Sequence, residues 1–217
     1  MDHASAAAAA PGTSGGSERL TALSDGVFAI AMTLLVLDVS VPPGLGPAGF
    51  HEALHQNVPN LLAYVLSFAV ISQFWWDHRR ILATLPTTDF GVTCLTLTGL
   101  GLIALMPFPT SLLAEYGGEP LAVAVYSGGV AVTNLAHVAL LLVSHRLQRR
   151  GGLPVNRKAQ RLDVADLAST VVIFGVAAPL AFVSPGLAKL VWILLVPAKM
   201  LIGRSQRRAV RAGHGAA

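Results

Sequence analysis

The sequence predicts an all-α membrane protein with six transmembrane helices and both termini in the cytoplasm. The first observation is composition: 53% of the 217 residues are hydrophobic and 12% are charged, whereas about a quarter of a soluble domain is charged. The second is a series of apolar stretches long enough to cross a bilayer. The third is that basic residues flank these stretches on alternate sides. Most of the chain is therefore expected to lie in lipid.

Six apolar stretches approach the roughly 20 residues that a transmembrane helix needs. In chain order they cover about residues 20–40, 57–76, 90–113, 121–144, 164–184 and 186–203. Pro107 and Pro109 are expected to bend or end the third span, and Pro197 to distort the end of the sixth. The turn sequence SPG at residues 184–186 predicts a helical hairpin between the last two spans.

The positions of Lys and Arg predict the orientation. The loop after the second span begins DHRR, the loop after the fourth reads HRLQRRGGLPVNRKAQR, and Arg19 precedes the first span. The opposite loops, residues 40–56 and 115–120, contain no Lys or Arg. The positive-inside rule therefore places both termini in the cytoplasm.

The two ends of the chain differ from the spans. Residues 1–18 are rich in Ala, Gly and Ser and lack the basic start of a signal peptide, so they are expected to form a disordered tail. Residues 204–217 are expected to form a basic cytoplasmic tail near anionic headgroups. Residues 19–203 between them form the predicted six-helix domain.

Several classes of function are not indicated. The sequence contains no phosphate loop, no HExxH and no Cys/His metal spacing, so no enzyme, metal site or cofactor is expected. The pI of about 9.7 arises from basic residues beside the spans, which fits membrane orientation better than nucleic acid. The TVGYG filter of common potassium channels is missing as well.

The first span carries polar residues on different helical faces. At about 100° per residue, one stripe consists of Gly26, Ile30, Thr33 and Leu37. The roughly opposite face consists of Asp25, Ala29, Met32 and Val36. An ionised carboxylate at this depth needs donors from other spans. Thr33 either lines a pore or bonds a carbonyl of its own helix.

The second span ends in QFWWDHRRI. Trp75 and Trp76 are expected to anchor the cytoplasmic boundary. His78 lies at a depth similar to that of Asp25 and is a candidate donor to this carboxylate.

Later spans carry further polar residues. Asn134 and His137 share a helical face, and hydrogen bonding between helices is favoured over a proton relay. Asp163 and Asp166 are expected to open the fifth span, where they would favour the helix dipole. Lys189 lies near the outer end of the sixth span, where its side chain can extend to the headgroups.

The segment RLTALSDGVFAIAMTLLVLDV, residues 19–39, resembles the first-helix signature of the transmembrane-protein-175 potassium channels, R-x-x-x-F-S-D followed by an apolar helix with Thr. Arg19, Ser24 and Asp25 match at the same spacing, and Leu23 replaces the phenylalanine.

The pair formed by Trp75 and His78 resembles a second feature of that family, with Arg79 in the place of its usual second histidine. The resemblance covers the membrane part of the chain, although its specific motifs occupy only the first two spans.

The resemblance implies a potassium-preferring cation channel in the bacterial plasma membrane, assembled as a homotetramer around a pore lined by the first helix. Ile30 would form the constriction and Thr33 a hydroxyl ring that K⁺ passes transiently. Leu37 would form a further apolar ring. The family's structural network maps to Arg19, Ser24, Asp25, Trp75 and His78. The expected partners are potassium ions and the bilayer, with no cofactor.

Two other functions stay open on the sequence. A proton-coupled secondary transporter would use Asp25, Asn134 and His137, and a non-conducting scaffold would recruit a partner through its basic tail. Four acids lie on the outer side, Asp38, Glu52, Glu115 and Glu119. They either concentrate cations there or only reflect the charge bias between the two sides.

Overall fold

The computed structural model describes residues 14–86, 89–153, 156–195 and 197–203. Within these ranges every regular element is a helix, and six stretches are long and apolar enough to span a membrane. These stretches are Gly16–Asp38, Val58–Ala83, Phe90–Glu115, Pro120–Arg150, Arg157–Leu180 and Pro185–Gly203. The predicted all-α fold with six membrane-spanning helices is confirmed.

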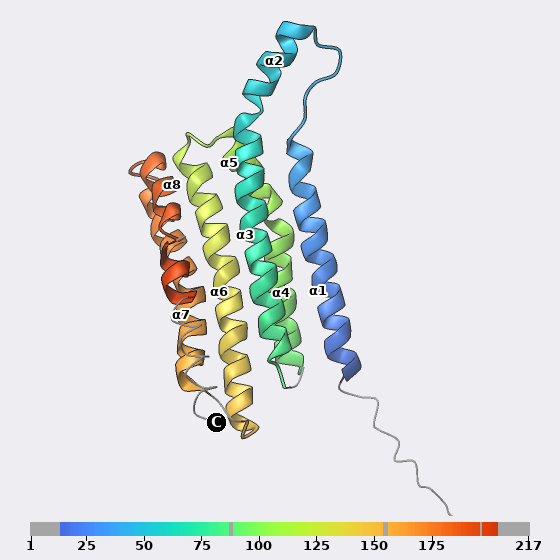
Figure 1. Cartoon of the computed structure of the whole chain (residues 1–217), viewed down its shortest axis with the longest axis vertical. Coiled ribbons are helices and arrows are strands. Elements are labelled where there is room, and N and C mark those ends of the chain that lie inside the picture. Colours follow the sequence, from blue (N-terminus) through green and yellow to red (C-terminus); the bar gives the residue numbers. More distant parts are fainter. Residues whose placement is uncertain (1–13, 87–88, 154–155, 196, 204–217) are drawn as a thin grey trace, which may run out of the picture.

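The long helices run side by side in one bundle (Figure 1). The elements are α1 (Ser14–Leu34), the 3₁₀ turn η1 (Leu35–Asp38), α2 (Pro47–Gln56), α3 (Val58–Ala83), α4 (Phe90–Leu105), α5 (Pro107–Glu115), α6 (Pro120–Arg150), α7 (Arg157–Leu180) and α8 (Pro185–Ile193). In the view of Figure 1, α1 lies at one edge and α7 and α8 at the other. Short α2 extends beyond the bundle, at the end opposite to the start of α1.

Prolines interrupt the spans at two of the predicted places. The third span breaks at Met106 into α4 and α5, and Pro107 begins the second half, where a missing backbone donor is tolerated. The sixth span is interrupted at Leu194, after which Pro197 lies in a second helical piece.

The predicted hairpin between α7 and α8 is also present, and the Ser184 hydroxyl accepts a hydrogen bond from the Leu187 amide at 3.4 Å.

The helices continue further toward the basic end than the apolar stretches indicated. The DHRR segment lies inside α3, and α6 continues to Arg150, because long basic side chains can reach polar surroundings while their backbone stays helical. The expected N-terminal tail, residues 1–18, is shorter than predicted because residues 14–18 belong to α1. Its remainder and the expected C-terminal tail, residues 204–217, lie outside the described residues.

The start of α7 corrects one prediction. This helix begins at Arg157, where the Asn156 side chain caps it by accepting the amides of Lys158 and Ala159. Asp163 and Asp166 therefore lie beyond the first turn, and the prediction that they favour the helix dipole is wrong.

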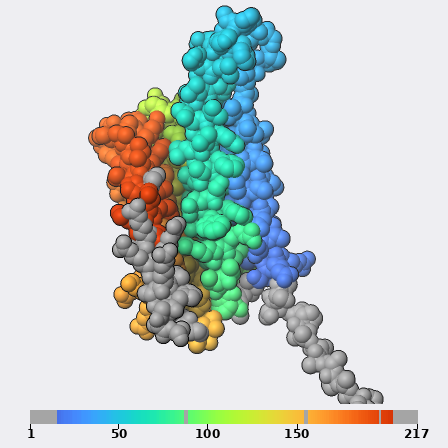
Figure 2. Space-filling model, viewed as in Figure 1, coloured from blue at the N-terminus to red at the C-terminus, as the bar shows by residue number. Residues whose placement is uncertain are grey.

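Apolar packing holds the bundle together in two clusters of buried residues. The larger cluster joins α1, α3, α6, α7 and α8 through residues that include Phe28, Phe74, Tyr126, Phe174 and Trp192. The smaller cluster lies toward the basic end and includes Leu20, Ile81, Val92, Leu140 and Leu167. Many large apolar side chains remain on the outer surface. Figure 2 shows α2 projecting beyond the closely packed body of the bundle. An apolar outer surface suits lipid rather than water.

A chain of hydroxyl groups links three helices inside the larger cluster. The oxygens of Thr110 and Ser67 are 2.8 Å apart, and those of Ser67 and Tyr126 are 3.2 Å apart. The Trp192 indole donates to the Ser127 hydroxyl at 3.2 Å. Buried polar groups at membrane depth thus pair with one another across α3, α5, α6 and α8.

Candidate pore helix and its supporting network

Helix α1 turns one face inward and one face outward. Its buried residues are Leu20, Ser24, Phe28 and Ala31, followed by Leu35 in η1. On the other side Ile30 is 61% exposed and Leu37 is 69% exposed, with Thr33 exposed between them. The stripe formed by these three residues points away from the rest of the chain.

The face that was predicted to oppose this stripe needs correction. Ala29 and Val36 are exposed, and Asp25 and Met32 are partly buried. These residues form the flank of the helix, about a quarter turn from the buried face, because the residues opposite the stripe are Ser24, Phe28, Ala31 and Leu35.

Thr33 makes one hydrogen bond within its own helix. Its hydroxyl donates to the Ile30 carbonyl at 2.9 Å, which is the local bond that membrane Thr residues often form. A hydroxyl has one proton but two lone pairs. The donated bond therefore leaves the oxygen free to face a cation.

Asp25 is held from α3. The Trp75 indole N–H donates to Asp25 Oδ1 at 2.8 Å, a bond strengthened by the carboxylate's charge. The Arg79 guanidinium lies 5.3 Å from the centre of the Trp75 ring, within the range of a cation–π contact. Sequence reasoning missed this role of Arg79, although its spacing of four residues from Trp75 on one helix was a usable signal.

Ser24 is the partner of His78. The Ser24 hydroxyl donates to the Leu20 carbonyl at 2.8 Å, and His78 Nε2 lies 3.1 Å from the same oxygen. Because the single hydroxyl proton is directed at the carbonyl, Nε2 of His78 must carry the proton and donate to Ser24. The prediction that His78 donates to Asp25 is therefore wrong: His78 donates to the neighbouring Ser24. The Asp25 carboxylate accepts its hydrogen bond from Trp75 instead.

Aromatic rings surround this bond. The Phe28 ring centre lies 5.5 Å from that of His78, and the His137 ring meets His78 edge-on at 5.3 Å. Phe74 stacks on His137 at 5.4 Å. Phe28 was not singled out in the sequence, although its position four residues after Ser24 places both on one face.

Asn134 and His137 do not bond to each other. The Asn134 amide donates to the Leu167 carbonyl and so joins α6 to α7, as the interhelical alternative predicted. His137 Nδ1 lies 2.9 Å from the Thr133 carbonyl of its own helix, so Nδ1 carries the proton.

Arg19 is not part of the contacts that join α1 to α3. It is exposed, and its side chain makes no hydrogen bond or ion pair with another residue in the described part of the chain. The structure therefore brings Ser24, Asp25, Trp75 and His78 together and leaves Arg19 apart.

Charged groups on α3 and α7 form a second cluster. Arg80 lies 3.5 Å from Asp77 and 3.4 Å from Asp163. Lys199 lies 3.2 Å from Asp166, which is itself 4.0 Å from Arg80. Asp163 and Asp166 of α7 thus pair with cations from two other helical segments.

The far end of α1 is tied to the start of α3. The Asn60 side chain donates to the Asp38 carbonyl at 3.0 Å, and the Asn57 side chain donates to the Ser40 carbonyl. The four predicted outer acids Asp38, Glu52, Glu115 and Glu119 are all exposed. No group of three or more His, Cys, Asp or Glu residues in the described ranges is arranged to hold a metal ion.

Comparisons with known proteins identify the family to which the chain belongs. Residues 19–107 match the family described as endosomal/lysosomal potassium channel TMEM175. A potassium channel of Streptomyces collinus is 38% identical over 185 residues, which cover 80% of this chain and 90% of that protein. The chain belongs to the TMEM175 family.

Further TMEM175 relatives extend the comparison. A potassium channel of Chamaesiphon minutus is 37% identical over 150 residues, covering 67% of this chain and 70% of that protein. The crystal structure of a lysosomal potassium-selective channel TMEM175 homolog from the same organism superposes with a TM-score of 0.73 at 30% identity. This superposition covers 87% of this chain and 98% of the Chamaesiphon chain. The matched residues 19–107 contain α1 from Arg19 onward and the Trp75–His78 segment.

Proposed function

We propose that this chain forms a potassium-preferring cation channel in the bacterial plasma membrane, with passive conduction through a pore lined by α1. The observation that carries the proposal is the outward stripe of α1. Ile30, Thr33 and Leu37 face away from their own subunit, while the opposite face of α1 is fixed against α3 and α4. The membership in the TMEM175 family and the potassium-channel names of its bacterial relatives support it.

A pore of this kind requires several copies around one axis, and a homotetramer is proposed. Four copies of Ile30 would form a narrow apolar ring, and four Thr33 oxygens would lie one helical turn away. Leu37 would form a further apolar ring. A cavity of about 560 Å³ between α1 and α3, lined by residues that include Asp25, Met32 and Trp76, remains open for contact with a second copy.

Selectivity in this arrangement depends on partial dehydration. An ion crossing the Ile30 ring must shed part of its water shell, and the Thr33 oxygens replace only some of the lost ligands. Weaker discrimination than that of a carbonyl-lined filter is therefore expected. The same apolar ring can close the pore by dewetting.

The transporter alternative receives less support from the geometry. It requires groups that exchange protons along a path, whereas Asn134 is bonded to the Leu167 carbonyl and His137 to the Thr133 carbonyl. Asp25 is bonded to Trp75. Each of these polar groups already holds neighbouring backbone or side chains in place.

The test is ion flux into liposomes that contain the purified protein. The wild type is expected to pass K⁺ down its gradient faster than Na⁺. Ile30→Asn is expected to raise the flux, because it places a polar group in the apolar ring, and Thr33→Ala is expected to lower the preference for K⁺. If both variants conduct K⁺ at the wild-type rate and keep the wild-type preference for K⁺ over Na⁺, the pore assignment is refuted.

Two control variants match these changes in local environment. Val172 on α7 is as exposed as Ile30, at 61%, so Val172→Asn introduces the same group elsewhere on the surface. The exposed Thr98 hydroxyl donates to the Cys94 carbonyl at 2.9 Å, much as Thr33 does to Ile30, so Thr98→Ala removes an equivalent local bond. Both controls are expected to conduct like the wild type.

A further inference from the structure

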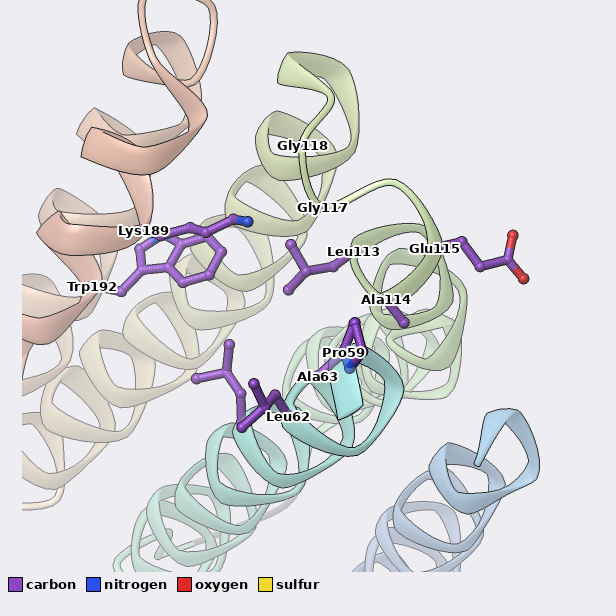
Figure 3. Close-up of a pocket in the computed structure, with 11 residues that line it drawn as sticks. Pro59, Leu62, Ala63, Leu113, Ala114, Glu115, Gly117, Gly118, Lys189 and Trp192 are labelled. Atoms are coloured by element: carbon purple, nitrogen blue, oxygen red, sulfur yellow. The ribbon is translucent and has the colours of Figure 1, made fainter. Parts of the chain in front are cut away.

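A cavity lies near the end of the bundle at which α2 projects. Its volume is about 480 Å³, within the roughly 300–1,000 Å³ of typical ligand pockets. Its walls are the first turns of α3, the end of α5, the turn between α5 and α6, and α8 (Figure 3). Leu62 on the α3 wall is 64% exposed, so the cavity opens to the surface of the bundle.

Most of the cavity wall is apolar. Leu62 and Leu66 of α3 line one side, Leu113 of α5 lies opposite them, and Trp192 of α8 closes the third side. The Trp192 ring is held in place by Phe174 at 5.7 Å and Tyr126 at 5.2 Å between ring centres. The wall is therefore a firm apolar surface at membrane depth, which an acyl chain can cover.

One cation is directed into this cavity. The Lys189 side chain crosses it toward the turn between α5 and α6 instead of extending outward, as Figure 3 shows. Lys189 is half-buried, and its ammonium group makes no hydrogen bond or ion pair with any residue that the structure describes. Glu115, which also lines the cavity, points its carboxylate away from it (Figure 3).

The turn that Lys189 faces leaves room for its ammonium group. A Cβ atom on Gly117 would lie 3.3 Å from Lys189 Nζ and 2.7 Å from the Leu113 carbonyl oxygen. Glycine at this position therefore permits the close approach. At neighbouring Gly118 a Cβ atom would meet nothing within 4 Å.

We propose that this cavity binds a phospholipid with an anionic headgroup. Its phosphate would contact the Lys189 ammonium, and one acyl chain would lie along the Leu62, Leu66 and Leu113 wall. The half-buried Lys189 ammonium has no partner among the residues that the structure describes, so an anion is favoured beside it. The bilayer supplies an anion whose attached chain fits the apolar part of the same cavity. Charge and apolar surface together identify a lipid rather than a soluble anion.

Such a lipid would hold α8 against α3. The buried residues of α8 are Ala188 and Trp192, and this helix packs mainly on α6 and α7. A lipid in the cavity would fill the space between α8 and the first turns of α3. This inference is independent of the proposed pore, because no residue of the pore stripe lines the cavity.

The experiment uses tryptophan fluorescence of the full chain in phosphatidylcholine vesicles. Phosphatidylglycerol or phosphatidylcholine with brominated acyl chains is added in increasing amounts, because bromine quenches a nearby indole. The chain has three tryptophans, and subtracting the signal of the Trp192→Phe variant isolates Trp192. Brominated phosphatidylglycerol is expected to quench Trp192 at an about fivefold lower mole fraction than brominated phosphatidylcholine.

Three variants locate the site. Lys189→Gln is expected to remove the preference for phosphatidylglycerol, whereas Lys158→Gln, a change of the same kind at the opposite end of the bundle, is expected to keep it. Gly118→Leu fills the cavity mouth without a backbone clash and is expected to reduce quenching by both lipids.

Three results would overturn the proposal. The first is equal quenching by both lipids in the wild type, or an unchanged preference in Lys189→Gln. The second is loss of the preference when inorganic phosphate is added, which would identify a free anion as the ligand. The third is absence of Trp192 quenching by either lipid, which would show that another copy of the chain covers the cavity.

Discussion

At the scale of single residues, Thr96 Oγ1 and His137 Nε2 are buried without a hydrogen-bond partner in the described part of the chain. Both residues line a void between α3, α4 and α6 that admits no water-sized sphere. A buried polar atom that neither protein nor water can satisfy destabilises the fold by about 1–3 kcal/mol.

This situation predicts that Thr96→Val stabilises the protein. Valine has the same shape as threonine and removes the unsatisfied hydroxyl, so the free energy of unfolding is expected to rise by about 1 kcal/mol. The measurement is the unfolding transition in mixed detergent micelles.

The matched control is Thr110→Val, in which the same atoms change but the hydroxyl is bonded to Ser67. This variant is expected to lose about 0.6 kcal/mol, the average for hydrogen bonds between membrane helices. A Thr96→Val protein that is less stable than the wild type would show that its hydroxyl has a partner in the membrane.

At the scale of the elements, α1 is positioned by hydrogen bonds from α3, and the two that reach oxygen atoms go to Ser24 and Asp25. The bonds to Ser24 and Asp25 come from residues three apart on α3, His78 and Trp75, so α1 is fixed in rotation as well as in depth. The rotation decides which side chains face outward. Polar contacts on the flank and the buried face of α1 therefore determine the direction of the Ile30 stripe.

Asp25→Asn is expected to lower the yield and stability of the assembled protein without changing ion preference. An amide still accepts the Trp75 hydrogen bond but loses the charge that strengthens it, at a loss of about 1 kcal/mol. Size-exclusion yield after heating measures assembly, and the K⁺/Na⁺ flux ratio of the surviving protein measures preference.

Asp89→Asn is the control for this substitution. Asp89 caps α4 by accepting the Val92 amide at 2.8 Å, and Asn is an equally good cap, so its yield should match the wild type. Normal assembly of Asp25→Asn together with an altered flux ratio would place Asp25 in the ion path instead.

The sequence predicted the six spans and the grouping of Ile30, Thr33 and Leu37 on one stripe of α1, because both depend on periodicity and hydropathy alone. The direction of that stripe was implied only by the family resemblance. It did not predict the hydrogen-bond partners, since Ser24 and Asp25 are adjacent and His78 lies at a depth that suits either. Helix ends were also misplaced, because hydropathy marks where lipid ends and not where the backbone stops being helical. Asp163 and Asp166 were misassigned for this reason.

At the scale of the whole molecule, the two ends of the bundle differ in charge. Arg79, Arg80, Arg149 and Arg157 lie where α3 and α6 end and α7 begins, whereas the acids Glu52, Glu115 and Glu119 lie at the α2 end. Arginines that are dispersed in the sequence thus lie together at one end, where Asp77, Asp163 and Asp166 partly balance them, and most charged residues at the other end are acidic. The acidic end would concentrate cations near an outer pore entrance.

This asymmetry predicts that the α2 end faces the cell exterior, because the positive-inside rule retains basic segments in the cytoplasm. The test uses Cys94→Ser as background, since Cys94 is exposed. Glu52→Cys on α2 is expected to react with a membrane-impermeant maleimide in intact cells. Gly151→Cys, in the connection between α6 and α7, is expected to react only after permeabilisation. The reverse labelling pattern would show that the topology is inverted. The four outer acids would then lie at the cytoplasmic mouth, where they would concentrate cations on the inside of the membrane and not on the outside.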